Sequence, residues 1–152
     1  MSVIVKIKKL DNYDNSLPLP SYETTGAAGA DVRASIGKGE KIIIKPGERV
    51  LVPTGLAMEI PHAYEIQVRP RSGMSFKTSL MVLNSPGTID CDYRGEVKVI
   101  MGNLGSEDQI IEHGDRVAQL VLAPVIQANY TIVDELSDTD RGEGGFGSTG
   151  KK

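Results

Sequence analysis

The chain has 152 residues, a length typical of one domain, and its 17 Lys and Arg against 20 Asp and Glu give a net charge of −3. This balance argues against a nucleic-acid backbone as the main ligand, and one cysteine (Cys91) with two histidines excludes an intrachain disulfide and a Cys/His zinc site. No apolar run reaches the ~20 residues of a membrane helix and no signal peptide is recognisable, so we expect no membrane partner and a reducing, cytoplasmic location.

Short segments rich in Val and Ile, separated by glycines and prolines, predict an all-β domain over residues 1–136. In chain order, the expected strands cover residues 3–7, 41–44, 49–52, 64–69, 96–99, 110–111 and 117–122. One short helix is expected directly after the fourth of these strands, with Ser72 as its N-terminal cap. Many brief strands without a long helix favour a jelly-roll-like barrel or sandwich.

Residues 137–152 differ from this domain because they are rich in glycine and contain no aliphatic residue from Arg141 onward. Such an arm cannot form a core of its own, and its composition alone favours a disordered terminus. Phe146 is the exception, since an aromatic ring among glycines has nothing local to cover it.

Two segments in the first half of the chain combine charged residues with turn formers. Residues 28–31 end in Asp31, and residues 70–73 place Arg71 beside a serine hydroxyl and a glycine. The second group predicts an anion site, because an arginine and free backbone N–H groups meet there. Taken alone, it is equally compatible with a surface cation next to an ordinary helix cap.

Two further segments follow in the second half. Residues 84–96 are bracketed by glycines and predict a hairpin whose tip holds Asp90 and Tyr93, although an acidic turn is most often simply solvated. In residues 114–119, a turn opens into a strand and Gln119 interrupts an apolar run. A buried amide at that position needs a hydrogen-bond partner.

In this order and spacing, the four segments and the arm resemble the five motifs of the trimeric deoxyuridine triphosphatases (dUTPases), enzymes that split dUTP into dUMP and pyrophosphate. The longest matching pieces are residues 87–96 and 141–147. The resemblance implies a homotrimer of jelly-roll-like subunits with three active sites at subunit junctions. It also implies Mg²⁺ as cofactor, water attack on the α-phosphorus, and a role in keeping uracil out of DNA and supplying dUMP for thymidylate synthesis.

The resemblance also implies roles for single residues. Asp90 stands in the place of the carboxylate that contacts the sugar and activates water, with Gln119 and Arg141 completing the catalytic set. Asp31 corresponds to the aspartate near the Mg²⁺ hydration shell, which contacts the ion through water. The implied phosphate-binding residues are Arg71, Ser72, Gly73, Gln119, Arg141, Gly147, Ser148 and Thr149. The implied base- and sugar-binding residues are Asn84, Gly87, Thr88, Ile89, Tyr93 and Phe146.

The chemistry of the nucleotide agrees with these roles. Uracil presents an acceptor, a donor and an acceptor, which a strand edge and the Asn84 amide can match. The amine of cytosine would leave a buried group unpaired, a penalty of ~1–3 kcal/mol. Tyr93 beneath the sugar would exclude a 2′-hydroxyl, and a narrow passage at Gly87 would exclude the methyl group of thymine.

Two other functions remain compatible with parts of this pattern. A dCTP deaminase-related enzyme would share the fold, but it would need a glutamate base beside the pyrimidine and would tend to lack the complete arm motif. A non-catalytic trimeric nucleotide-binding module would keep the fold without the reaction. The presence of both Asp90 and Arg141 argues against the second alternative.

Overall fold

The computed structural model describes residues 2–146 and confirms the predicted all-β class. The strands are β1 (Lys6–Lys9), β2 (Ala30–Arg33), β3 (Lys41–Ile44), β4 (Arg49–Glu59), β5 (Tyr64–Arg69), β6 (Leu80–Val82), β7 (Gly87–Ile89), β8 (Glu96–Asn103), β9 (Gln109–Glu112) and β10 (Arg116–Pro124). The described helix is α1 (Ser72–Lys77). None of the helical structure in residues 2–146 is long and apolar enough to cross a membrane.

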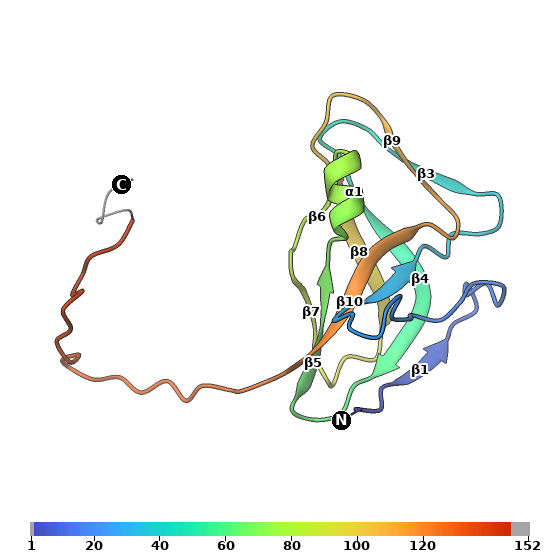
Figure 1. Ribbon diagram of the computed structural model, residues 1–152. Coiled ribbons are helices and arrows are strands. Elements are labelled where there is room, and N and C mark those ends of the chain that lie inside the picture. Colours follow the sequence, from blue (N-terminus) through green and yellow to red (C-terminus); the bar gives the residue numbers. More distant parts are fainter. Residues whose placement is uncertain (1, 147–152) are drawn as a thin grey trace.

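Two four-stranded antiparallel sheets form the body, with strand orders β1-β4-β8-β6 and β2-β10-β5-β7 (Figure 1). In β5, Ile66 and Val68 are buried whereas Arg69 is exposed, so alternate side chains point into the core, as the sequence predicts. Strands β3 and β9 form a third, two-stranded antiparallel sheet. Side chains from all three sheets form one core, as expected for packed sheets. Its fully buried members are Ala34, Ile44, Val52, Val99, Met101, Ile111, Val117 and Ala118.

Strands β2, β6 and β7 fall where the sequence predicts turns or no element. Asp31 in particular lies inside β2, paired with Gln119 of β10, and not in a turn. The four residues of β2 do alternate between buried and partly buried side chains, but the glycines at 26 and 29 just before them indicate a turn. The pairing of β2 with a strand far along the chain stabilises the extended backbone there.

The predicted hairpin at residues 84–96 is also wrong. Strand β7 pairs with β5 in one sheet, whereas β8 pairs with β4 and β6 in the other. Residues 90–95 therefore cross between the two sheets. Glycine and acidic residues mark a change of chain direction in both cases, and only the long-range pairing distinguishes a hairpin from such a crossing.

Helix α1 is present where expected, but Ser72 is not its cap. Arg71 occupies the cap position with an extended backbone (φ −92°, ψ 132°), and no described side chain caps the helix. Ser72 is the first helical residue, so its hydroxyl is not committed to the capping role that the sequence predicts.

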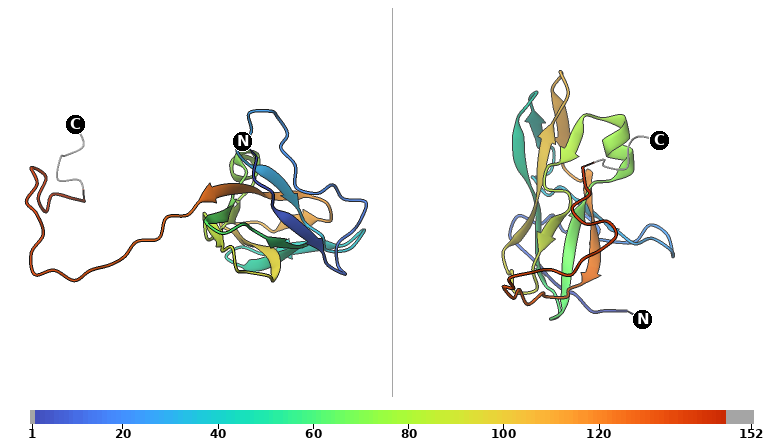
Figure 2. Two further views of the ribbon diagram at one scale, coloured as in Figure 1. Left: turned by 90° about the horizontal axis from the view of Figure 1, so that it is seen from below. Right: turned by 90° about the vertical axis from the view of Figure 1, so that its left-hand side faces the viewer.

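Beyond β10 the chain leaves the sheets. Residues 125–146 form neither helix nor strand, and most of this segment extends away from the body, as Figure 1 and the left-hand view of Figure 2 show. The apolar side chains of Ile126, Tyr130, Ile132 and Leu136 are 87–98% exposed. This extended segment has no core of its own, in line with the composition of its end.

Candidate active site

Asp31 holds two arginines at one end of the second sheet. Its Oδ1 accepts a hydrogen bond from Arg71 Nε at 3.0 Å, and its Oδ2 accepts one from Arg116 Nη1 at 3.2 Å. The side chains of Asp31 and Arg71 are only 12% and 25% exposed, so solvent weakens their charge-assisted bond little. Arg71 also donates to the Arg116 carbonyl at 3.4 Å. These two hydrogen bonds fix Arg71 in place. Because a guanidinium has five N–H donors, Arg71 still has donors left for an anion.

Gln119 lies in the middle of the same sheet, opposite Asp31 on one side and Arg69 on the other. Its Nε2 donates to the Pro70 carbonyl oxygen at 2.9 Å, which is the partner that the sequence requires for this amide. Pro70 immediately precedes Arg71. The structure thus brings together three of the sequence-predicted segments in a single cluster, which we call the phosphate-end cluster (Asp31, Pro70, Arg71, Arg116 and Gln119).

Ser72 and Gly73 extend this cluster toward solvent. Both are exposed in the first turn of α1, directly after Arg71. A Cβ added at Gly73 would meet no described atom within 4 Å. The surface over this turn is therefore open to a ligand.

The donor set here limits how a metal ion can bind. Within residues 2–146, no three His, Cys, Asp or Glu side chains gather into a metal site. Asp31 is a single carboxylate, and both of its oxygens accept hydrogen bonds from arginines. Such a set fits an ion that takes its ligands mainly from phosphate oxygens and water, as Mg²⁺ commonly does, with Asp31 acting through water.

A second group of sequence-predicted residues lies on β7, which is the last strand of its sheet and pairs only with β5 among the described strands. The other edge of β7 can therefore offer backbone donors and acceptors to a ligand. Thr88 is exposed, whereas Ile89 is 8% exposed and packs in the core. Ile89 can contact a ligand at this edge through its backbone only.

Asn84 and Gly87 lie against each other at the start of this strand. A Cβ on Gly87 would stand 2.9 Å from Asn84 Nδ2 and 3.3 Å from Val68 Cβ. Any side chain at position 87 would displace the Asn84 amide. The bare glycine is therefore what allows the amide to lie beside the strand edge.

Tyr93 follows in the crossing between the sheets. Its hydroxyl donates to the Glu96 carbonyl oxygen at 3.1 Å, and its ring lies over Gly95, where an added Cβ would stand 2.9 Å from Tyr93 Cε2. The side chain is 47% exposed. A held and half-exposed ring of this kind presents one face to a ligand.

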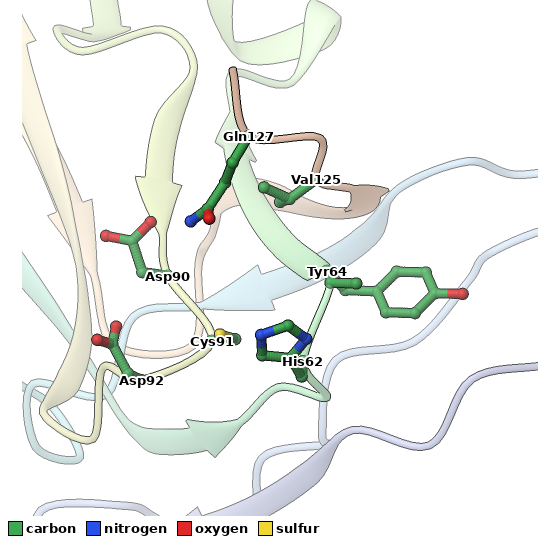
Figure 3. A pocket seen from close by; sticks show the side chains of 8 residues that line it. His62, Tyr64, Asp90, Cys91, Asp92, Val125 and Gln127 are labelled. Atoms are coloured by element: carbon green, nitrogen blue, oxygen red, sulfur yellow. The ribbon is translucent and has the colours of Figure 1, made fainter. Parts of the chain in front are cut away.

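Asp90 directly follows β7 and is exposed. Figure 3 shows its carboxylate and that of Asp92 turned to the same side, while the intervening Cys91 points toward His62. A cavity of about 550 Å³ lies beside these residues and is also lined by Tyr64, Val125 and Gln127. A carboxylate at the rim of such a cavity can accept a proton from water.

Asp90 and Arg71 lie at opposite ends of β5. Ile89 pairs with Ile66, so Asp90 leaves the sheet beside Glu65, six residues before Arg71. Six steps of extended chain span about 20 Å at ~3.3 Å per residue. One chain therefore does not bring the carboxylate and the phosphate-end cluster together.

The arm residues lie apart from both groups. Arg141 donates from Nε to the Gly144 carbonyl oxygen at 2.7 Å within the arm, and Phe146 is fully exposed. Both belong to the segment that extends away from the body (Figure 2). The predicted phosphate ligands Gly147, Ser148 and Thr149 lie outside the described residues.

Arg116 is a site residue that the sequence interpretation missed. It belongs to the quoted segment 114–119, yet nothing local distinguishes it from a surface cation. Its main partner Asp31 is 85 residues away in the chain, and Glu23 lies 3.8 Å from it on the solvent side. The only available signal was its place two residues after Gly114, at the start of the strand that carries Gln119.

Comparison with known proteins gives consistent results. The family model described as dUTPase matches residues 15–150. The chain is 57% identical over 148 residues to the deoxyuridine 5′-triphosphate nucleotidohydrolase of Roseobacter denitrificans, with 97% of each chain covered. It is 59% identical over 147 residues to that of Bdellovibrio bacteriovorus, with 97% and 96% covered. A solved mutant dUTPase of Staphylococcus bacteriophage 80alpha with dUpNHpp is 26% identical, with a TM-score of 0.83 and coverage of 98% and 99%.

Proposed function

The chain belongs to the dUTPase family, and we propose that it hydrolyses dUTP to dUMP and pyrophosphate by water attack on the α-phosphorus. One observation carries the proposal furthest. Asp90 directly follows β7, which is an edge strand of its sheet among residues 2–146, so hydrogen-bonding backbone groups and a carboxylate lie side by side. That arrangement suits a ligand with both a base to be recognised and a bond to be hydrolysed.

The triphosphate binds to the phosphate-end cluster in this proposal. Arg71 supplies positive charge from a position fixed by Asp31, and the exposed Ser72 and Gly73 supply a hydroxyl and backbone N–H groups. Gln119 positions the phosphate and the attacking water. When bound, Mg²⁺ would neutralise charge on the phosphate oxygens.

The deoxynucleoside binds along the free edge of β7. Backbone groups of Gly87, Thr88 and Ile89 and the amide of Asn84 can pair with uracil, and we expect the narrow passage at Gly87 to exclude the methyl group of thymine. The ring of Tyr93, held by its hydroxyl, packs beneath the sugar and excludes a 2′-hydroxyl.

Asp90 acts as the general base. It takes the proton from the attacking water as the oxygen of that water bonds to the α-phosphorus, and the bond to the bridging oxygen breaks to release pyrophosphate. Such a base contributes roughly 10²–10⁴-fold to the rate.

The site is shared between subunits of a homotrimer. The support is the separation of about 20 Å along β5 and an arm whose apolar side chains are exposed in the single chain. A neighbouring subunit can bring its Asp90 to the phosphate-end cluster, and the arm of residues 137–152 then closes over the nucleotide. Arg141, with Gly147, Ser148 and Thr149, would contact phosphate and Phe146 would cover the uracil.

The test is pyrophosphate release measured with dUTP, UTP, dCTP and dTTP in Mg²⁺. We expect release with dUTP and at least ~10-fold less with the other three. Ammonia release from dCTP would support the deaminase alternative. Binding of dUTP without product release would support the non-catalytic module.

A further inference from the structure

The backbone of Gly29 lies directly against the side chain of Gln119. Gly29 precedes β2, the neighbour of β10, and Gln119 passes it to reach the Pro70 carbonyl oxygen. A Cβ added at Gly29 would overlap Gln119 Oε1, and it would stand 3.0 Å from Gln119 Cδ and 3.1 Å from Gln119 Cβ. Position 29 therefore forms one wall of the passage that the amide occupies.

The conformation of the backbone does not explain a glycine at this position. Gly29 is absent from the glycines with positive φ, which in the described chain include Gly37, Gly39 and Gly47. An alanine could adopt its dihedral angles, so the relevant property of Gly29 is the space left by its missing side chain.

Turning the Gln119 amide aside would not fully relieve the overlap. Rotation could move Oε1 and Cδ, but Gln119 Cβ is fixed to the backbone of β10. At 3.1 Å from the added Cβ it is closer than an ordinary contact, so the edge of β2 would also have to shift. Both adjustments act against the hydrogen bond from Gln119 to Pro70.

We infer that Gly29 is a positioning residue: its missing side chain lets Gln119 hold the Pro70 carbonyl and thereby fixes the turn that carries Arg71 and Ser72. The effect on turnover rests on the proposed function, whereas the effect on the turn does not. The two parts can therefore be tested separately.

The structural part is tested by amide hydrogen exchange without nucleotide in Gly29→Ala. The reporters are the amides of Ser75 and Thr78, which donate to the Arg71 and Met74 carbonyl oxygens at 3.0 Å each. We expect exchange about 5-fold faster or more, because the turn loses its tether and opens more often. Gly26→Ala is the matched control, since Gly26 lies in the same loop and a Cβ there would meet nothing within 4 Å. Equal exchange in the two variants would overturn the inference.

The functional part is tested by kcat/KM for dUTP in a double-mutant cycle. We expect Gly29→Ala to lower kcat/KM about 10-fold or more in the otherwise unchanged chain. The same change should cost less than about 3-fold in a Gln119→Ala background, because Oε1 and Cδ, the two atoms nearest the new Cβ, are gone and only Gln119 Cβ remains, at 3.1 Å. Equal losses in both backgrounds would show that Gly29 does not act through Gln119 and would overturn the inference. An inactive parent chain would refute the proposed function and leave the exchange result as the test of Gly29.

The cycle also covers the case in which Gly29→Ala does not fold. The double variant Gly29→Ala with Gln119→Ala should then recover a folded protein, as measured by circular dichroism and thermal unfolding. If the double variant also fails to fold, the overlap with the Gln119 amide is not what makes Gly29→Ala unstable, and the inference is wrong.

Discussion

Replacing Asp31 with asparagine tests whether this carboxylate orders the phosphate-end cluster before any ligand binds. The substitution keeps the size of the side chain and removes the charge shared by Arg71 and Arg116. The oxygen of the new amide can still accept from Arg71 Nε. Its NH₂ group, however, would face Arg116 Nη1 as donor against donor, in place of the 3.2 Å bond present now.

The expected decrease in the free energy of unfolding depends on how far each of the two Asp31–arginine bonds is exposed to solvent. A hydrogen bond to a charged group contributes about 1.5–3 kcal/mol and a neutral one about 0.5–1.5 kcal/mol. The bond between Asp31 and Arg71 is largely shielded from solvent, so we assign it most of the difference between these two ranges. Arg116 is 38% exposed, so its bond to Asp31 contributes no more than a surface ion pair, about 1 kcal/mol or less. Together these terms give a destabilisation of about 2 kcal/mol.

The assay is urea unfolding at matched protein concentration, with a chelator present and no nucleotide, so that neither metal nor substrate contributes. Glu23→Gln is the control, because Glu23 is 3.8 Å from the same arginine but 56% exposed, and it should cost less than about 0.5 kcal/mol. A stability loss no larger than that of the control would refute the ordering role of Asp31. A raised Mg²⁺ requirement with unchanged stability would instead place the action of Asp31 on the ion alone.

Three further outcomes test the proposed site. Asp90→Asn should keep binding of a non-hydrolysable dUTP analogue and lower kcat at least ~10²-fold; near-normal turnover would remove Asp90 from the role of base. Tyr93→Ala should lower dUTP turnover and raise the ratio of UTP to dUTP turnover, whereas an unchanged ratio would show that ribose is rejected elsewhere. Chains lacking residues 141–152 and Asp90→Asn chains should each be nearly inactive, yet refolding them together in equal amounts should restore about a quarter of the sites. A mixture as inactive as its parents would contradict a site shared between subunits.

The sequence predicts those parts of the fold that local patterns determine. Strands β5 and β10 are recognisable because their apolar residues alternate or run continuously, and α1 follows a turn signal. Strand β7 is not recognisable, since three residues carry no period and its partner β5 is distant in the chain. For the same reason the crossing that holds Asp90 and Tyr93 looks like a hairpin in the sequence.

The site shows a similar division between local and long-range information. Arg71, Asp90 and Gln119 stand out as candidates by residue type, because each is a charged or polar residue next to turn formers or inside an apolar run, and the resemblance to the five motifs then implies their roles. Their supports are not recognisable in this way. Arg116 acquires its meaning only from the carboxylate of Asp31, and Gly29 only from the amide that passes over it. Both contacts depend on which strands pair with each other, and local patterns in one sequence do not predict that pairing.

The phosphate-end cluster is held rigidly and the arm is not, and this difference suits a reaction in which charge is stabilised quickly and the product is then released. Arg71 is locked by Asp31, and the Pro70 turn is tethered by Gln119, so charge stabilisation at the phosphates needs little reorganisation when substrate arrives. The arm is the opposite case, because a glycine-rich segment must lose much conformational freedom to close. Contacts of Arg141 with phosphate and of Phe146 with the base must offset that cost together. Once pyrophosphate leaves, the contacts with the β- and γ-phosphates are gone, and only the α-phosphate and the base of dUMP are left to hold the arm. Loss of pyrophosphate therefore favours reopening of the site. In the complete chain, dUMP should bind far more weakly than a non-hydrolysable dUTP analogue. In the chain that lacks residues 141–152, the difference in affinity between these two ligands should be smaller.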